Sequence, residues 1–93
     1  MTDARGNLHG YVEAAAEASG LPVKVITSRQ RRGAPWRHAA MKLARDAGWS
    51  SSVIGGAFGM DHTTVLYGER AAQDEFVRAV RACLTGQAEL PVD

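Results

Sequence analysis

Apolar and polar positions repeat along most of the chain with the spacing of amphipathic helices. Within 35–47 the apolar side chains at 36, 39, 40, 43 and 47 form one stripe of a helix with about 3.6 residues per turn. Together with the breaks between such stripes, this pattern predicts six helices with short connections. The predicted helices span 7–19, 22–28, 35–47, 50–58, 61–72 and a last segment that begins at Asp74 and stays apolar to Leu84.

Glycine and proline mark most of the predicted helix boundaries. Gly20 and Gly48 follow the last positions of their helices, where a glycine commonly ends a helix. Pro22 and Pro35 stand where a helix begins, a place that tolerates proline because the first turn donates no intrahelical N–H bond. The segment RQRRGA at 29–34 breaks the helical period and is predicted as a loop.

The predicted helices at 50–58 and 61–72 are separated by a tight turn at Gly59 and Met60. Serines at 50–52 can cap the first helix, and the Asp61 carboxylate can cap the second. Two helices joined by a short glycine-containing turn are typical of a helix-turn-helix. The predicted fold class is therefore all-α, with about six short helices and a central helix-turn-helix.

The length of 93 residues is typical of a single domain. From the helical pattern we expect a flexible start at 1–6 and one helix-turn-helix domain at 7–85. The polar segment 86–93 is predicted as a tail or the start of a linker. A linker would make the domain the first part of a longer regulator.

The net charge is only +1, but the basic residues are unevenly distributed. No Asp or Glu interrupts the stretch from Lys24 to Arg45, which suggests a polyanionic partner. A solvated basic face without a partner is the other interpretation of this charge pattern. The seven basic residues of the stretch are Lys24, Arg29, Arg31, Arg32, Arg37, Lys42 and Arg45.

Composition excludes several classes of protein. Cys83 is the one cysteine, so neither an intramolecular disulfide nor a zinc site of several thiolates can form. No run approaches the roughly 18 apolar residues of a membrane span, and the N-terminal segment lacks the apolar core of a signal peptide. We expect a cytoplasmic protein with no membrane partner, associated with the nucleoid if its partner is DNA.

The run Asp61, His62, Thr63 and Thr64 stands directly before the apolar pair Val65–Leu66. Such a run can cap a helix, hold a metal or a catalytic group, or present hydrogen-bonding tips to a partner. No other histidine lies at ligand spacing, and neighbours on one helical turn point apart and cannot form a proton relay, so neither a metal site nor an enzyme is expected.

In a helix-turn-helix, the first turn of the second helix faces the major groove, where these four side chains could bond base edges. Helical spacing is expected to turn Val65, Leu66 and the far side of Tyr67 towards the core. The predicted helix would then be polar and exposed at its first turn and apolar and buried along the rest of its length.

The segments FGMDHTTVLYG and RQRRGAPWRHAAMKLARDAG resemble the C-terminal DNA-binding domain of DnaA, the bacterial replication initiator. The likeness covers about residues 10–72 and implies a Trp-repressor-like fold that binds double-stranded DNA. It implies that Arg29 enters the minor groove and that Asp61, His62 and Thr63 contact bases, with Thr64 beside them. It also places Arg37 and His38 near phosphate, and we add Arg31, Arg32 and Lys42 as phosphate contacts from their charge.

The chain departs from the family pattern in the turn before the recognition helix, and it lacks the ATPase motif of the initiator. Gly59-Met60-Asp61 is one residue shorter than usual and lacks a basic residue before the aspartate. No Gly-x-x-x-x-Gly-Lys-Ser/Thr occurs, so we expect no nucleotide or other cofactor and no ATP-dependent initiator activity.

These observations leave three functional hypotheses. The first is a bacterial or phage-derived transcriptional regulator that binds a specific DNA sequence and works with the transcription machinery. The second is control of replication at an origin, with replication proteins as partners. The third is a protein–protein adaptor that has kept the fold but lost DNA binding, which the shortened turn and the low net charge favour.

Overall fold

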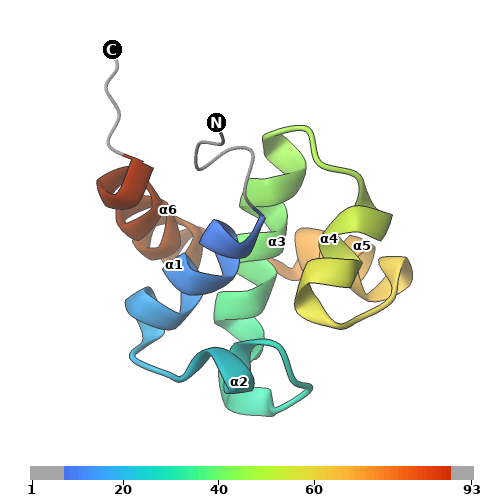
Figure 1. Ribbon diagram of the computed structural model, residues 1–93, viewed down its shortest axis with the longest axis horizontal. Coiled ribbons are helices and arrows are strands. Elements are labelled where there is room, and N and C mark those ends of the chain that lie inside the picture. Colours follow the sequence, from blue (N-terminus) through green and yellow to red (C-terminus); the bar gives the residue numbers. More distant parts are fainter. Residues whose placement is uncertain (1–7, 89–93) are drawn as a thin grey trace.

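The computed structural model describes residues 8–88 (Figure 1), and all of its regular structure in that range is helical. This confirms the all-α prediction and the six helices. In chain order the elements are α1 (His9–Ser19), α2 (Val23–Ile26), the 3-10 turn η2 (Arg31–Gly33), α3 (Ala34–Asp46), α4 (Ser51–Phe58), α5 (His62–Ala71) and α6 (Asp74–Ala88).

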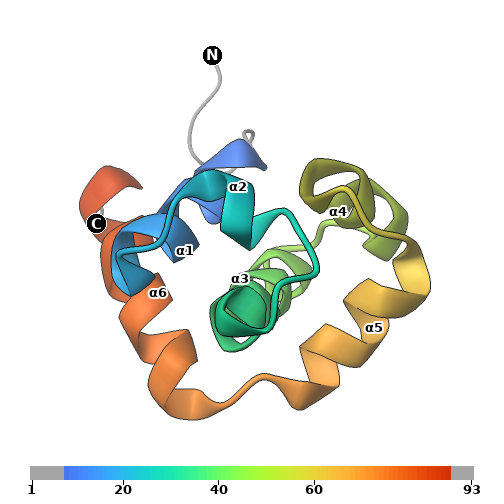
Figure 2. The same cartoon turned by 90° about the horizontal axis from the view of Figure 1, so that it is seen from below.

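Helix α3 is the centre of the domain. Figure 2 shows it nearly end-on, with α1 and α6 on one side and α4 and α5 on the other. Ala39, Ala40 and Ala44 are completely buried, because small side chains let neighbouring helices approach this helix on several faces. Trp36 packs at the edge of this core, where its ring meets that of Phe76 edge-on at 4.7 Å between centroids.

The turn between α4 and α5 is closed by backbone hydrogen bonds. Gly59 adopts a left-handed φ of 70°, and the Met60 N–H donates to the Gly55 carbonyl at 2.8 Å. This 6→1 bond is the Schellman ending that a left-handed glycine permits. Met60 is buried below the turn, and Phe58 is fully buried before it, so the two helices of the motif are fixed to one core. The predicted turn at Gly59 and Met60 is confirmed.

Three local details differ from the sequence-based expectations. The 29–34 segment is not a simple loop, because η2 forms one tight turn at its centre before α3. Asp74 begins α6 instead of preceding it as a cap, and the Phe76 and Val77 N–H groups donate to the Gln73 carbonyl. Helix α6 also continues to Ala88, into the segment predicted as a polar tail. The predicted start at 1–6 lies outside the described residues, as do residues 89–93 of the predicted tail.

The paired glycines of α4 provide a test of this packing. A Cβ on Gly55 would collide with the Met60 carbonyl oxygen, whereas a Cβ on Gly56 would meet nothing within 4 Å. We expect Gly55→Ala to destabilise the domain by about 1–3 kcal/mol through overpacking. Gly56→Ala should stabilise it by about 0.5–1 kcal/mol, because alanine favours the helix more than glycine does. Urea unfolding of both variants measures the two effects, and equal shifts in the same direction would contradict the packing described.

Candidate nucleic-acid interface

Asp61 begins α5 as its N-cap. Its Oδ1 accepts hydrogen bonds from the Thr64 N–H at 2.9 Å and from the Thr64 hydroxyl at 2.8 Å. Both bonds favour the ionised carboxylate and are the main causes that lower the pKa of Asp61; desolvation opposes them, and the nearby Arg29 adds a smaller lowering effect. The predicted cap is confirmed, and the Thr64 hydroxyl takes part in it.

The first turn of α5 presents three polar side chains to solvent. Asp61, His62 and Thr63 are exposed, whereas Thr64 is half-buried and Val65 is completely buried. The structure therefore exposes three of the four predicted base readers together at one helix end, with the fourth, Thr64, half-buried behind them. This arrangement has the geometry of a recognition helix, whose N-terminal residues meet base edges in the major groove.

The arginine-bearing segment, residues 29–32, comes close to the turn of the helix-turn-helix. Arg29, Arg31 and Arg32 are all exposed. The Thr27 carbonyl oxygen lies 3.6 Å from the position that a Cβ on Gly59 would take, and the Arg29 charge acts on the Asp61 carboxylate. Segments about 30 residues apart in sequence thus come close together, with Arg29 near the exposed start of α5.

Arg37 does not lie on this surface. Its side chain is buried, and its guanidinium donates to the Ile26 carbonyl at 3.3 Å and to the Gln30 carbonyl at 3.5 Å. Burial, and then the nearby charge of Arg29, lower the pKa of Arg37. A guanidinium turned inwards onto two backbone carbonyls is not available to DNA, so the structure argues against the predicted phosphate contact. Arg37 instead holds the arginine-bearing segment onto α3.

His38 and Lys42 also have partners within the domain. The His38 ring is half-buried and meets the Tyr67 ring edge-on at 5.6 Å, and both rings line a hollow between α3, α5 and the start of α6. Burial, followed by the charge of Arg37, lowers the pKa of His38 and keeps its imidazole neutral at pH 7. Lys42 forms an ion pair with Asp46 at 3.2 Å, about 12 Å along α3 from its first residue.

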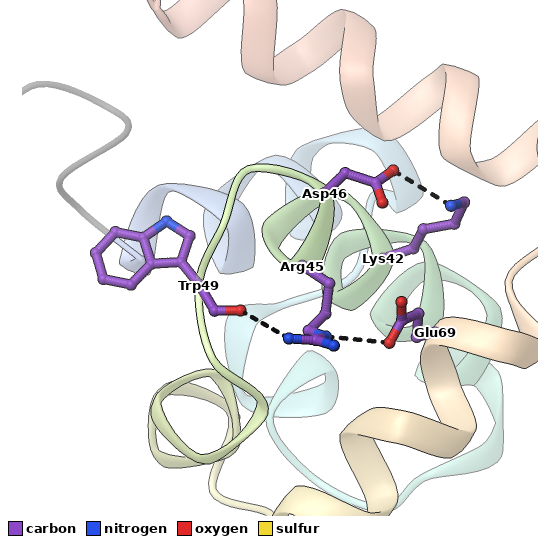
Figure 3. A network of polar contacts seen from close by, with 5 residues as sticks. All are labelled: Lys42, Arg45, Asp46, Trp49 and Glu69. Carbon is purple, nitrogen blue, oxygen red and sulfur yellow. Dashed lines mark hydrogen bonds and ion pairs between the residues drawn. The ribbon is translucent and has the colours of Figure 1, made fainter.

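A polar link that the sequence analysis did not identify orients the far end of α5. In Figure 3, the Arg45 guanidinium lies between the Glu69 carboxylate, at 3.1 Å, and the Trp49 carbonyl, at 3.3 Å. Both charged side chains are about one-third exposed, at 34% and 29%. The sequence contained only a weak signal for this pair, because its members are 24 residues apart and on different helices.

The predicted inward orientation of Leu66 is wrong. Leu66 is 37% exposed and Tyr67 is 64% exposed, whereas Val65 and Gly68 supply the buried side of α5. The signal was available from helix geometry, since Leu66 follows His62 by four residues and therefore shares its face. The exposed face of α5 is thus polar in the first turn of the helix and partly apolar in the second turn.

Other kinds of site find no support in the residues described. None of them forms a group of three or more His, Cys, Asp or Glu side chains placed to hold a metal ion. Within the same range, no helix combines the length and apolar character needed to cross a membrane.

The charge of the Asp61 cap can be tested through the pH dependence of stability. Asn at this position keeps a capping oxygen but removes the charge. Because folding lowers the pKa of the Asp61 carboxyl, its ionised form stabilises the native state above the unfolded pKa of about 3.9. This stabilisation is lost as the pH falls through the folded-state pKa. We expect the wild type to be more stable than Asp61→Asn at pH 7 and the difference to vanish near pH 2.

Urea unfolding at both pH values measures the effect. Ser50→Ala is the matched control, because Ser50 caps α4 through a group that does not titrate, by accepting from the Val53 N–H at 3.2 Å. The Ser50→Ala deficit should therefore change little with pH. A deficit of Asp61→Asn that is equally large at pH 7 and near pH 2 would contradict the assignment.

Comparison of the sequence with models of known protein families gives a match. A family model described as the bacterial DnaA protein helix-turn-helix matches residues 12–71 of the 93-residue chain. This range includes the arginine-bearing segment, α3 and the α4–α5 motif. A search of curated proteins gives no match. The chain belongs to the family of bacterial DnaA helix-turn-helix domains, which points to DNA binding.

Proposed function

We propose that this domain binds double-stranded DNA at a specific sequence, with α5 in the major groove. The observation that carries the proposal is the start of α5, where Asp61, His62 and Thr63 are exposed and the charge of the exposed Arg29 acts on the Asp61 carboxylate. The Asp61 carboxylate can accept from a cytosine amino group, and the Thr63 side chain can bond a base edge and touch a thymine methyl. His62 can form hydrogen bonds in the same groove through its ring nitrogens.

The arginine-bearing segment would bind the minor groove and the phosphates of the DNA beside the recognition helix. Arg29 is assigned to the adjacent minor groove, where narrow stretches attract guanidinium groups. Arg31 and Arg32 are the main phosphate contacts, with His38 and Lys42 at the margin of the interface. Thr64 would support the readers from within the cap, since its hydroxyl already donates to Asp61. Arg37 would contribute by fixing the segment that carries Arg29.

Transcriptional regulation in a bacterial or phage-derived system is the proposed cellular role, with the protein on the nucleoid in the cytoplasm. Control of replication at an origin would use the same contacts with replication proteins as partners. The adaptor hypothesis has weaker support, because the exposed arginines and the exposed polar side chains at the start of α5 have no evident use in it.

Selection of bound duplexes from a random pool at about 100 mM salt tests the proposal. Thr63→Ala should weaken binding to the selected site about tenfold and relax one position of the motif, since it removes a base contact. Arg29→Ala should relax the adjacent A·T-rich positions. Arg31→Ala should lower affinity for all duplexes and reduce the slope of log affinity against log salt by about 0.9. Arg78→Ala, which removes an exposed charge from α6, is the control and should bind as the wild type does.

Each failure of this experiment has a different meaning. Salt-dependent binding without an enriched motif would replace the sequence-specific reader with a non-specific DNA-binding protein. A folded wild type that binds no duplex would favour the adaptor. Similarity of the enriched motif to the initiator's recognition sequence would favour replication control over an independent regulator.

A further inference from the structure

A hollow opens beside the central helix, where α5 ends and α6 begins. Its volume is about 470 Å³, and clefts of roughly 300–1,000 Å³ are the usual size of ligand sites. The start of α3, the second half of α5 and the start of α6 line it. Its walls include the rings of His38, Tyr67 and Phe76, so the hollow offers aromatic surfaces to a bound group.

Neighbouring rings hold these walls in place. Tyr67 is 64% exposed, but its ring meets the His38 ring edge-on at 5.6 Å between centroids. The Phe76 ring is likewise edge-on to the ring of Trp36, which packs against the core. Side chains that are already fixed lose less conformational entropy when a partner binds. The hollow is therefore a preformed feature of the domain.

The charge of the hollow is negative, in contrast to that of the arginine-bearing segment. Glu75 is the one ionised side chain in its lining, and it takes part in none of the ion pairs within the part of the chain that the structure describes. Burial and then the charge of Arg37 lower the pKa of His38, so its imidazole adds no positive charge at pH 7. Asp74, next to Glu75 in sequence, is a second exposed carboxylate, and Arg78 does not line the hollow.

This combination of charge and aromatic surface fits a guanidinium group. A carboxylate without an ion-pair partner favours a cation and repels the phosphates of DNA. The guanidinium of arginine is flat and weakly hydrated, and it can stack on an aromatic ring while it bonds a carboxylate, whereas the compact ammonium of lysine is strongly hydrated. Because the hollow is open on one side, a free small cation would be only partly covered, and a protein segment can cover the rest of the site.

We propose that this hollow is a docking site for an arginine side chain of a protein partner. The guanidinium group would lie against the Tyr67 and Phe76 rings and pair with the Glu75 carboxylate. Tyr67 follows His62 by five residues, or about 7.5 Å along the axis of α5. The partner would therefore stand beside the proposed DNA-binding end of the domain. Docking of this kind does not require bound DNA.

Titration of the ¹⁵N-labelled wild type with the capped peptide acetyl-Gly-Gly-Arg-Gly-Gly-amide tests the proposal, because chemical shifts detect weak binding. We expect saturable changes at amides within 34–38, 67–71 and 73–76. The same peptide with citrulline in place of arginine keeps the shape but not the charge, and it should bind at least about threefold more weakly, the effect of one exposed ion pair. The lysine peptide should also bind more weakly than the arginine peptide, because it lacks the flat stacking surface.

Two pairs of variants locate the site. Glu75→Gln removes the carboxylate and should weaken binding of the arginine peptide about threefold, whereas Asp74→Asn removes the neighbouring charge outside the lining and should not. Tyr67→Ala removes an aromatic wall and should weaken binding by about the same factor, whereas Tyr67→Phe keeps the ring and should not. Thermal unfolding of each variant shows that it is folded.

Equal losses in Glu75→Gln and Asp74→Asn would show an effect of net charge alone and would overturn the proposal. Equal binding of the arginine and citrulline peptides, changes centred away from the hollow, or no saturable change would do the same. Changes at the hollow with a DNA duplex but not with the peptide would assign it to the DNA interface instead. None of the peptide results bears on the selection of a DNA motif, so the proposed function stands or falls separately.

Discussion

The buried guanidinium of Arg37 joins the central helix of this domain to the segment that carries its exposed arginines. Taking a charge out of water is costly unless its donors are satisfied, and here two backbone carbonyls, of Ile26 and Gln30, accept from it. The approach is close, since a Cβ on Gly33 would lie 3.0 Å from the Val25 carbonyl oxygen. The position of the arginine-bearing segment therefore follows from the packing of α3.

The recognition helix is fixed to the same helix at its other end. Glycine at 68 allows α5 to approach Met41, and the Arg45–Glu69 ion pair closes the contact one residue later. The buried Met60 holds the turn before α5 in the core. Rigid elements position contact groups more accurately than free loops do, and both halves of the proposed interface are built in this way on α3. The surface proposed to bind DNA is thus already formed in the unbound domain.

Sequence reasoning identified the helices and the exposed tip because local rules determine them. Gly59, Ser50 and Asp61 end or cap their helices as glycine, serine and aspartate generally do, and these features require no knowledge of the tertiary contacts. It failed where a side chain depends on distant packing. The charge of Arg37 suggested a surface role, but two carbonyls from an earlier segment hold it inside. Leu66 looked like a core residue, yet the glycine at 68 turns it outwards.

The central claim is that the arginine-bearing segment and the start of α5 form one DNA-binding surface. Titration of ¹⁵N-labelled protein with its selected duplex tests this claim most directly, because each backbone amide reports on its own surroundings. We predict that the largest chemical-shift changes fall at 28–32 and 61–67, while amides of α1 and of the second half of α6 change little. Changes concentrated on α1 and α6, with 28–32 and 61–67 unaffected, would contradict the account.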